Sequence, residues 1–277
     1  MSDTALAPYL RMWSLKAAGT AIVTPTAILQ PVTCPDGRDA MLRLATAVSD
    51  DEDCTTSGAD LLQAWNGHGA AQVYARKGHA LLIESAVGTD SLIDMAQNGN
   101  DAAATQILCD TAARLHAHTI APPSSLIPLD QWFRSLIVPD HTGLLATCAQ
   151  TAKRLLDQSG QSVPLHGDLH HGNVLDFGSR GWLAIDPKGL LGDRAFEYAV
   201  MFTNPDLAAP DHPIAAGAFE RRFMQISAAA NLPACSLRDW IIAGAGLSAA
   251  WFMEDDNPLG AVPLDIAARA LRLDLPA

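Results

Sequence analysis

The spacing of hydrophobic and polar positions divides this chain into one part with strand-like runs and another with helical stripes. Short apolar runs predict strands at residues 21–23, 27–32, 40–44, 72–75 and 80–83. Pro-Asp-Gly at 35–37 and Lys-Gly at 77–78 lie between such runs and predict hairpin turns. Apolar positions within residues 57–66 recur at helical spacing and predict one short helix. We therefore expect the first part to form an antiparallel sheet.

Helical periodicity prevails after residue 100, where apolar residues recur three and four positions apart. It predicts helices at residues 101–118, 143–158, 193–202, 213–230, 237–254 and 264–272. Strands that come first and helices that follow are typical of an α+β protein with two unequal lobes.

Composition and charge exclude several classes of protein. Hydrophobic residues make up 49% of the chain and charged residues 17%, so it can bury a large core and is not expected to be disordered. The net charge of −12 would repel nucleic acid. Five scattered cysteines without a C-x-x-C pair argue against a disulfide framework and for a reducing compartment. The uncharged run at 17–35 is broken by prolines, and no secretory signal is visible, so we expect a cytoplasmic protein without membrane association.

The segment HGDLHHGN at 166–173 carries the most informative chemistry. Asp168 and Asn173 have the D-x-x-x-x-N spacing of the catalytic loop of kinases, where the Asp takes a hydroxyl proton and the Asn holds Mg²⁺. A strand, a turn at 178–181 and a returning strand would bring Asp186 back beside Asn173. An amide oxygen and a carboxylate that converge in this way suit Mg²⁺ with bound phosphates.

Two other interpretations of this segment have to be weighed. Asp176 begins an Asp-Phe-Gly triplet that kinases use for metal binding, but it follows Asn173 by three residues and falls at the predicted turn. We therefore expect Asp176 to support the turn. The neighbouring histidines could instead form a zinc cluster, although no second ligand pair at helical spacing accompanies them. These histidines are His166, His170 and His171.

With these residues in place, the sequence resembles the aminoglycoside phosphotransferases, in particular the branch of streptomycin 6-kinase and hydroxyurea phosphotransferase. The resemblance is carried by LHGDLHHGNVL at 165–175, SRGWLAIDPKGLLGD at 179–193, ARLH at 113–116 and LSAAW at 247–251. It implies a protein-kinase-like fold with a small β-rich lobe over 1–86, a hinge near 84–88 and a helical lobe over 87–277. It also implies ATP and Mg²⁺ as cofactors, Asp168 as catalytic base, and Asn173 and Asp186 as metal ligands.

The small lobe departs from the pattern of this family. The contacts with the nucleotide that the resemblance implies are Thr26 in the turn at 24–27, Arg43, and the hinge residues Glu84 and Ala86. Arg43 stands on the third strand where such kinases carry a Lys. The position of the helix Glu that pairs with this Lys is held by Thr55, which cannot form an ion pair, and Asp53 is an alternative partner.

Acidic residues after a long apolar helix are the candidates for acceptor binding. Aminoglycosides are polycations, and Glu254 and Asp255 follow the helix at the position where the resemblance places the acceptor cleft. A solvated helix end is the competing interpretation, although acids are unfavourable at a helix C-terminus. Asp193 is expected to cap the next helix instead.

These observations predict an ATP-dependent phosphotransferase that acts on a hydroxyl of a small, cationic molecule, most simply an aminoglycoside of the streptomycin type. Two alternatives stay open. The changes at Arg43 and Thr55 are compatible with a nucleotide-binding protein that has lost efficient transfer. The catalytic loop does not encode the acceptor, so another amino alcohol or a sugar metabolite is a third interpretation.

Overall fold

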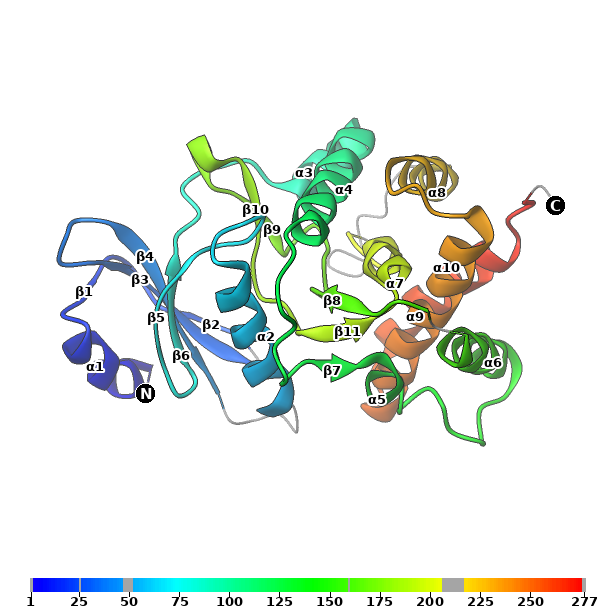
Figure 1. The fold of residues 1–277 in the computed structure, drawn as a ribbon, viewed down its shortest axis with the longest axis horizontal. Coiled ribbons are helices and arrows are strands. Elements are labelled where there is room, and N and C mark those ends of the chain that lie inside the picture. The colour runs from blue at the N-terminus through cyan, green and yellow to red at the C-terminus, as the bar shows by residue number, and fades with distance from the viewer. Residues whose placement is uncertain (1, 25, 47–51, 159, 206–216, 276–277) are drawn as a thin grey trace.

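A computed structural model describes residues 2–24, 26–46, 52–158, 160–205 and 217–275 of the chain. A β-sheet flanked by two helices forms one end of the molecule, a group of helices forms the other, and short strands lie between them (Figure 1). The expected α+β architecture is therefore confirmed. The lobe boundary near residues 84–88 stays a prediction.

The N-terminal lobe is built on an antiparallel sheet with the strand order β1-β3-β4-β6-β5, and β2 pairs with β3. Its strands are β1 Lys16–Ala17, β2 Ile22–Val23, β3 Ala27–Thr33, β4 Asp39–Ala45, β5 Val73–Lys77 and β6 Ala80–Glu84. The predicted turn joins β3 to β4, where the Gly37 N–H donates to the Cys34 carbonyl at 2.9 Å. Gly37 has a φ of +85°, a conformation that glycine adopts without strain.

The two faces of this sheet are covered by different helices (Figure 1). Leu81 and Ile83 of β6 pack into the cluster that contains Leu61 of α2, Glu52–Trp65. Alternate residues of β6 pack on the other side with Leu6 of α1, Ser2–Met12. Helix α2 begins five residues before the predicted start, and α1 was not predicted.

The C-terminal lobe is mainly helical, as expected. Its helices are α3 Leu92–Met95, α4 Asp101–Ala117, α5 Leu129–Trp132, α6 Gly143–Asp157, α7 Arg194–Ala199, α8 Ala218–Ala229, α9 Ala234–Glu254 and α10 Ala261–Leu271, with a π-helical turn at Ala96–Asn100 and 3-10 turns at Val200–Phe202 and Pro258–Gly260. Helix α9 is central, because it packs against α6, α7 and α10. Residues 213–216 of the predicted helix at 213–230 lie outside the described residues. Across the described ranges, no helix is long and apolar enough to cross a membrane.

Short strands between the lobes hold the loops that carry the predicted chemistry. They are β7 Ile127–Pro128, β8 Val163–Leu165, β9 Val174–Asp176, β10 Trp182–Ala184 and β11 Leu190–Gly192. Strands β9 and β10 form the predicted hairpin, with a 3-10 turn at Gly178–Arg180. Strand β11 pairs with β7 in parallel and with β8 in antiparallel orientation, a small sheet that was not predicted. The loops at 166–173 and 185–189 therefore each leave a paired strand and meet at the same place.

Candidate active site

Asp168 and Asn173 lie in contact on the loop between β8 and β9. The Asn173 Nδ2 donates to the backbone carbonyl of Asp168 at 2.9 Å and to its Oδ2 at 3.3 Å. The loop is closed by the Asn173 N–H, which donates to the His170 carbonyl at 2.9 Å. The spacing in the sequence therefore corresponds to a real contact between the two side chains.

His166 fixes the start of this loop from the inside. Its side chain is fully buried, its Nδ1 accepts the Asp168 N–H at 3.2 Å, and its Nε2 lies 2.8 Å from the Ile185 carbonyl. These two partners require the proton on Nε2, so His166 acts as a neutral crosslink between Asp168 and the strand that leads to Asp186. Because both of its nitrogens are used in this way, His166 has a structural role in the loop.

Glu197 of α7 is a functional candidate that the sequence did not reveal. Its carboxylate is fully buried and accepts the N–H groups of His166 at 2.6 Å and Gly167 at 3.0 Å. His116 Nε2 lies 3.5 Å from the same carboxylate. Burial raises the pKa of Glu197, but the contact with His116 and the hydrogen bond from the Gly167 N–H outweigh burial, and the pKa of the carboxyl is lowered. A carboxylate within the apolar run of α7 was the only signal in the sequence.

Asp186 returns to the site through the hairpin, as the sequence predicted. The Ile185 N–H donates to the Asn173 carbonyl at 2.9 Å, which places Asp186 next to Asn173. Asp186 has a φ of +54°, the left-handed region, where a non-glycine residue is uncommon and strained. Its Oδ1 lies 2.9 Å from Nη2 of Arg43 on β4, so this strand and the hairpin meet through an ion pair.

The oxygen atoms of Asn173 and Asp186 fit a hard divalent cation. The Asn173 Nδ2 is held by Asp168, which leaves the amide oxygen as the free end of the side chain. The Asp186 side chain is 40% exposed and has a second oxygen besides the one that Arg43 binds. An amide oxygen and a carboxylate from adjacent backbone positions are the ligand types that Mg²⁺ prefers.

The structure bears on the two other interpretations of residues 166–178, a role for Asp176 in metal binding and a zinc cluster of histidines. Asp176 Oδ1 accepts the Gly178 N–H at 2.8 Å, which confirms its turn-supporting role. In the part of the chain that the structure describes, no group of three or more His, Cys, Asp or Glu side chains is placed to hold a metal ion. The zinc alternative therefore finds no support from the arrangement of the histidines.

Two further groups lie against the Asp168 carboxylate. Lys188 Nζ lies 3.4 Å from its Oδ2, and His170 Nε2 lies 3.5 Å from its Oδ1. The His170 Nδ1 accepts the Gly172 N–H at 3.0 Å, which orients the imidazole. Burial lowers the pKa of His170, although the Asp168 carboxylate opposes this shift. The contact between Asp168 and Lys188 could not be predicted from local spacing, because the two residues are 20 positions apart.

The residues expected to contact the nucleotide lie in three places. Thr26 is exposed in the turn between β2 and β3. Glu84 ends β6, and its carboxylate forms an ion pair with Arg180 of the hairpin and accepts the Gln72 N–H at 3.2 Å. Ala86 is half-buried and packs against the apolar cluster that contains Phe177. The side chain of Glu84 is therefore occupied by the hairpin, while its backbone begins the segment at 84–88.

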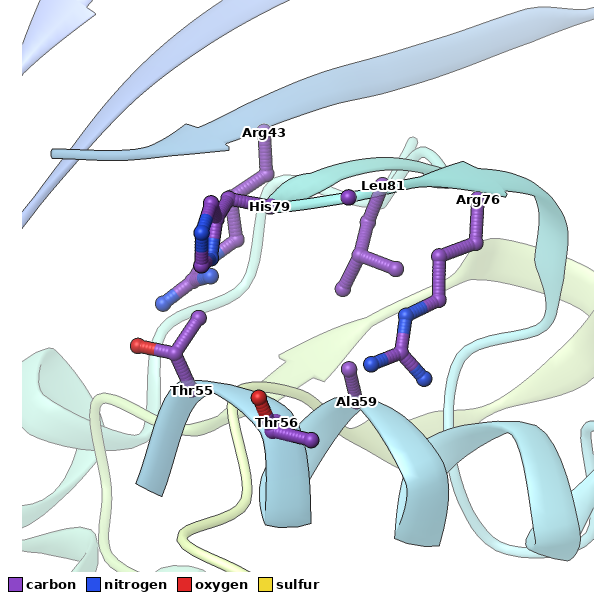
Figure 2. Close-up of a pocket in the computed structure, with 8 residues that line it drawn as sticks. Arg43, Thr55, Thr56, Ala59, Arg76, His79 and Leu81 are labelled. Atoms are coloured by element: carbon purple, nitrogen blue, oxygen red, sulfur yellow. The ribbon is translucent and has the colours of Figure 1, made fainter. Parts of the chain in front are cut away.

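Arg43 and Thr55 line one cavity between the sheet and α2 (Figure 2). At one end the Arg43 and His79 side chains approach Thr55, and Arg76 lies at the other end. Arg76 forms an ion pair with Asp60 of α2. Thr55 therefore lies opposite Arg43, as expected for the residue at the position of the helix Glu. The carboxylate that pairs with Arg43 is that of Asp186. The Asp53 side chain lies outside the described residues.

Helix α2 touches the Asp186 loop through backbone atoms. A Cβ added to Gly58 would lie 1.9 Å from the Pro187 carbonyl oxygen. Gly189 has a φ of +74°, and a Cβ there would lie 2.4 Å from the Ser57 carbonyl carbon. Ser57 also donates from its Oγ to the Ser125 carbonyl at 2.6 Å. Only glycine fits at these two points, so α2 and the loop are in direct contact through their backbones.

Within the described ranges, no hydrogen bond or ion pair joins the candidates for acceptor binding to the catalytic loop. Glu254 is the last residue of α9, and both it and Asp255 are exposed. Trp251, one turn earlier, packs edge-to-face on Trp132 at a centroid distance of 5.1 Å. Their role stays a prediction. Asp193 accepts the Ala195 N–H at 2.8 Å and caps α7, as expected.

Comparisons with known proteins agree with this arrangement. The model of a family described as aminoglycoside/hydroxyurea antibiotic resistance kinase matches residues 12–256. Streptomycin 3''-kinase of Klebsiella pneumoniae is 45% identical over 271 residues, which cover 95% of this chain and 99% of that protein. Hydroxyurea phosphotransferase of Kitasatospora aureofaciens is 30% identical and covers 90% of this chain and 73% of its own. The solved structure titled amicoumacin kinase hAmiN in complex with AMP-PNP, Ca²⁺ and Ami superposes with a TM-score of 0.65 at 14% identity, covering 96% of this chain and 94% of that one. The expected protein-kinase-like fold is confirmed.

Proposed function

The chain belongs to the aminoglycoside/hydroxyurea antibiotic resistance kinase family, and on that premise we propose that it transfers the γ-phosphoryl group of ATP to a hydroxyl of a streptomycin-type aminoglycoside. The observation that carries the proposal is the contact between Asp168 and Asn173, with Asp186 brought alongside by the Ile185 hydrogen bond. The relative at 45% identity is named streptomycin 3''-kinase, which favours the 3'' hydroxyl as the acceptor group over the 6 hydroxyl.

Asp168 is the group that accepts the proton. Its carboxylate is 33% exposed, so an acceptor can reach it. The Asp168 N–H is held by His166, and the N–H groups of the two residues before it are held by Glu197. The acceptor oxygen bonds to the γ-phosphorus while the bond to the β–γ bridging oxygen breaks, the hydroxyl proton passes to Asp168, and ADP leaves with the electron pair. Asn173 and Asp186 would hold Mg²⁺, which supplies charge neutralisation at the β- and γ-phosphates when bound.

The nucleotide would lie between the lobes, with its adenine at a hinge over residues 84–88. Ala86 packs in an apolar cluster with Leu175 and Ile185, and all three are only half-buried. This surface suits a flat heterocycle. Thr26 would cover the phosphates from above. Arg43, 2.9 Å from Asp186, already lies at the place where phosphates and metal would meet, and its guanidinium can bind phosphate oxygens in pairs.

Glu254 and Asp255 would bind the cationic groups of the acceptor. Both carboxylates are exposed at the end of α9, and their charge complements a polycation. Replacing them with Gln and Asn should raise the KM for streptomycin severalfold and leave the KM for ATP unchanged. An unchanged KM for streptomycin would reject this acceptor site.

The proposed mechanism is tested by replacing Asp168 with Asn. Transfer of phosphate from ATP to streptomycin should fall by at least about 1,000-fold, because proton transfer and orientation are lost together, while AMP-PNP should still raise the melting temperature. Asp110→Asn is the matched control, because Asp110 is exposed on α4 and accepts a hydrogen bond from Gln106 of the same helix. Transfer by Asp168→Asn at the rate of the native protein would overturn the mechanism.

A second candidate function is nucleotide binding without efficient transfer. Thr55 opposite Arg43 favours it, because α2 offers no carboxylate to Arg43 at that position. ATP would then raise the melting temperature, but no phosphate would reach any hydroxyl in a panel of aminoglycosides, hydroxyurea, choline and ethanolamine. Transfer to choline or ethanolamine alone would instead favour an amino alcohol as acceptor.

A further inference from the structure

Lys188 is held at the catalytic centre by the loop that follows Asp186. Its backbone N–H donates to the His166 carbonyl at 2.8 Å, so residue 188 is tied to the base of the catalytic loop. Next to it, Gly189 packs against the backbone of Ser57 with no room for a side chain. The stem of Lys188 therefore starts from a fixed point, and its Nζ reaches Oδ2 of Asp168 at 3.4 Å.

The ion pair between Lys188 and Asp168 is expected to add little to the free energy of unfolding. Both side chains are about one-third exposed, at 35% and 33%. Ion pairs with this exposure contribute little to folding, because water screens the charges and the long side chain loses freedom. The Lys188 ammonium extends from a fixed backbone into a site that solvent can reach. Binding of an anionic ligand at this site would explain its position better than a contribution to folding.

The proposed reaction supplies such an anion. In phosphoryl transfer the charge spreads over the three equatorial oxygens of the γ-phosphoryl group, and cations around it lower the barrier. The acceptor oxygen lies between Asp168 and the phosphorus, so a cation in contact with Asp168 lies beside that phosphoryl group. Arg43 contacts the Asp186 carboxylate instead, on the side of the proposed metal. An ammonium has three donors and can bind Asp168 and a phosphoryl oxygen together.

We propose that Lys188 binds an oxygen of the γ-phosphoryl group of ATP and, through Asp168, fixes where the acceptor hydroxyl meets it. This inference rests on the proposed function. Lys188 remains protonated during the transfer, the hydroxyl proton goes to Asp168, and ADP takes the electron pair of the broken bond. The residue is thus a catalytic residue that adds a cation beside the γ-phosphoryl group, while Arg43 stands at the Lys position on β4.

The test compares Lys188→Gln and Lys188→Arg with the native protein. Lys188→Gln should lower kcat for streptomycin by about 100- to 1,000-fold, the usual effect of removing one donor to a developing charge. Calorimetric titration should show weaker AMP-PNP binding with unchanged ADP binding, because only AMP-PNP carries a third phosphoryl group. Lys188→Arg should recover part of both losses. Lys153→Gln is the matched control, since Lys153 is exposed on α6.

The outcomes distinguish a wrong role for Lys188 from a wrong proposed function. Equal losses of ADP and AMP-PNP affinity in Lys188→Gln, or a kcat within threefold of the native value, would overturn the role of Lys188. A native protein that transfers phosphate to no acceptor would overturn the proposed function, while the ratio of the two nucleotide affinities would still test Lys188. If Lys188→Gln fails to fold, as judged by circular dichroism, Lys188→Met takes its place, with the same expected losses and the same outcomes that would overturn the role of Lys188.

Discussion

The buried carboxylate of Glu197 offers a sharp test of how this site is held together. Replacing Glu197 with Gln keeps the size of the side chain and removes its charge. One amide oxygen can still accept a backbone N–H, but the amide nitrogen would face either the His166 or the Gly167 N–H, which now bond to carboxylate oxygens at 2.6 and 3.0 Å. One hydrogen bond to a charged group is lost and one buried donor is left without an acceptor.

The size of this loss follows from the contacts. A hydrogen bond to a charged group contributes about 1.5–3 kcal/mol, and an unsatisfied buried donor costs about 1–3 kcal/mol more, so we expect about 2.5–6 kcal/mol in total. The pKa of Glu197 is lowered in the folded protein, with burial opposing and His116 favouring ionisation. Its contribution is therefore present above the ordinary carboxyl value of 4.5 and is lost as the pH falls through the lowered native value.

The assay is urea unfolding at pH 7, followed by tryptophan fluorescence, together with transfer kinetics. Glu197→Gln should lower the midpoint and reduce kcat at least about tenfold, because the backbone of His166 and Gly167, which leads into Asp168, is held less firmly. The difference in unfolding free energy from the native protein should shrink as the pH approaches 4. Glu220→Gln on the exposed side of α8 is the matched control. A loss below 1 kcal/mol together with native kcat would refute the reasoning, which rests on charge-assisted bonds of ordinary strength.

Two further substitutions test how the lobes are joined. Gly58→Ala would place a Cβ 1.9 Å from the Pro187 carbonyl, so we expect a loss of about 1–3 kcal/mol in unfolding free energy and reduced kcat, while Gly160→Ala, with open space around it, should match the native protein in the same urea titration. A Gly58→Ala variant with native stability and rate would show that the contact is not tight. Arg180→Ala removes the ion pair with Glu84, and because Arg180 is partly exposed the stability should change by less than about 1 kcal/mol, whereas the KM for ATP should rise as the segment at 84–88 loosens. An unchanged KM for ATP would separate this ion pair from nucleotide binding.

The sequence predicted those parts of the site that depend on local spacing. Asp168 and Asn173 are five positions apart on one loop, and Asp186 follows from counting along a hairpin whose turn residues are recognisable. Glu197 and Lys188 could not be predicted in this way. Each meets the catalytic loop through contacts between segments 20 or more residues apart, and such contacts leave no period or turn signal in the sequence.

The elements that were missed share the same cause. Helix α1 contains Pro8, which reads as a helix breaker, yet Leu6 is buried and packs with residues of the sheet such as Val32. Tertiary burial therefore overrides the local signal. Strand β7 has two residues and exists because it pairs with β11, more than 60 positions away. The early start of α2 at Glu52 likewise lacks an apolar stripe, since four of the five residues at 52–56 are polar.

The close backbone contact between Gly58 and Pro187 has a consequence for how the structure responds to salt and pH. Ion pairs between lobes weaken when salt is added or when a carboxylate takes up a proton. Steric contact between two main chains has neither sensitivity, because it depends on van der Waals volume alone. The position of α2 against the Asp186 loop should therefore stay the same across a wide range of ionic strength and pH. An inhibitor that displaces this helix would have to disrupt the backbone packing between Gly58 and Pro187.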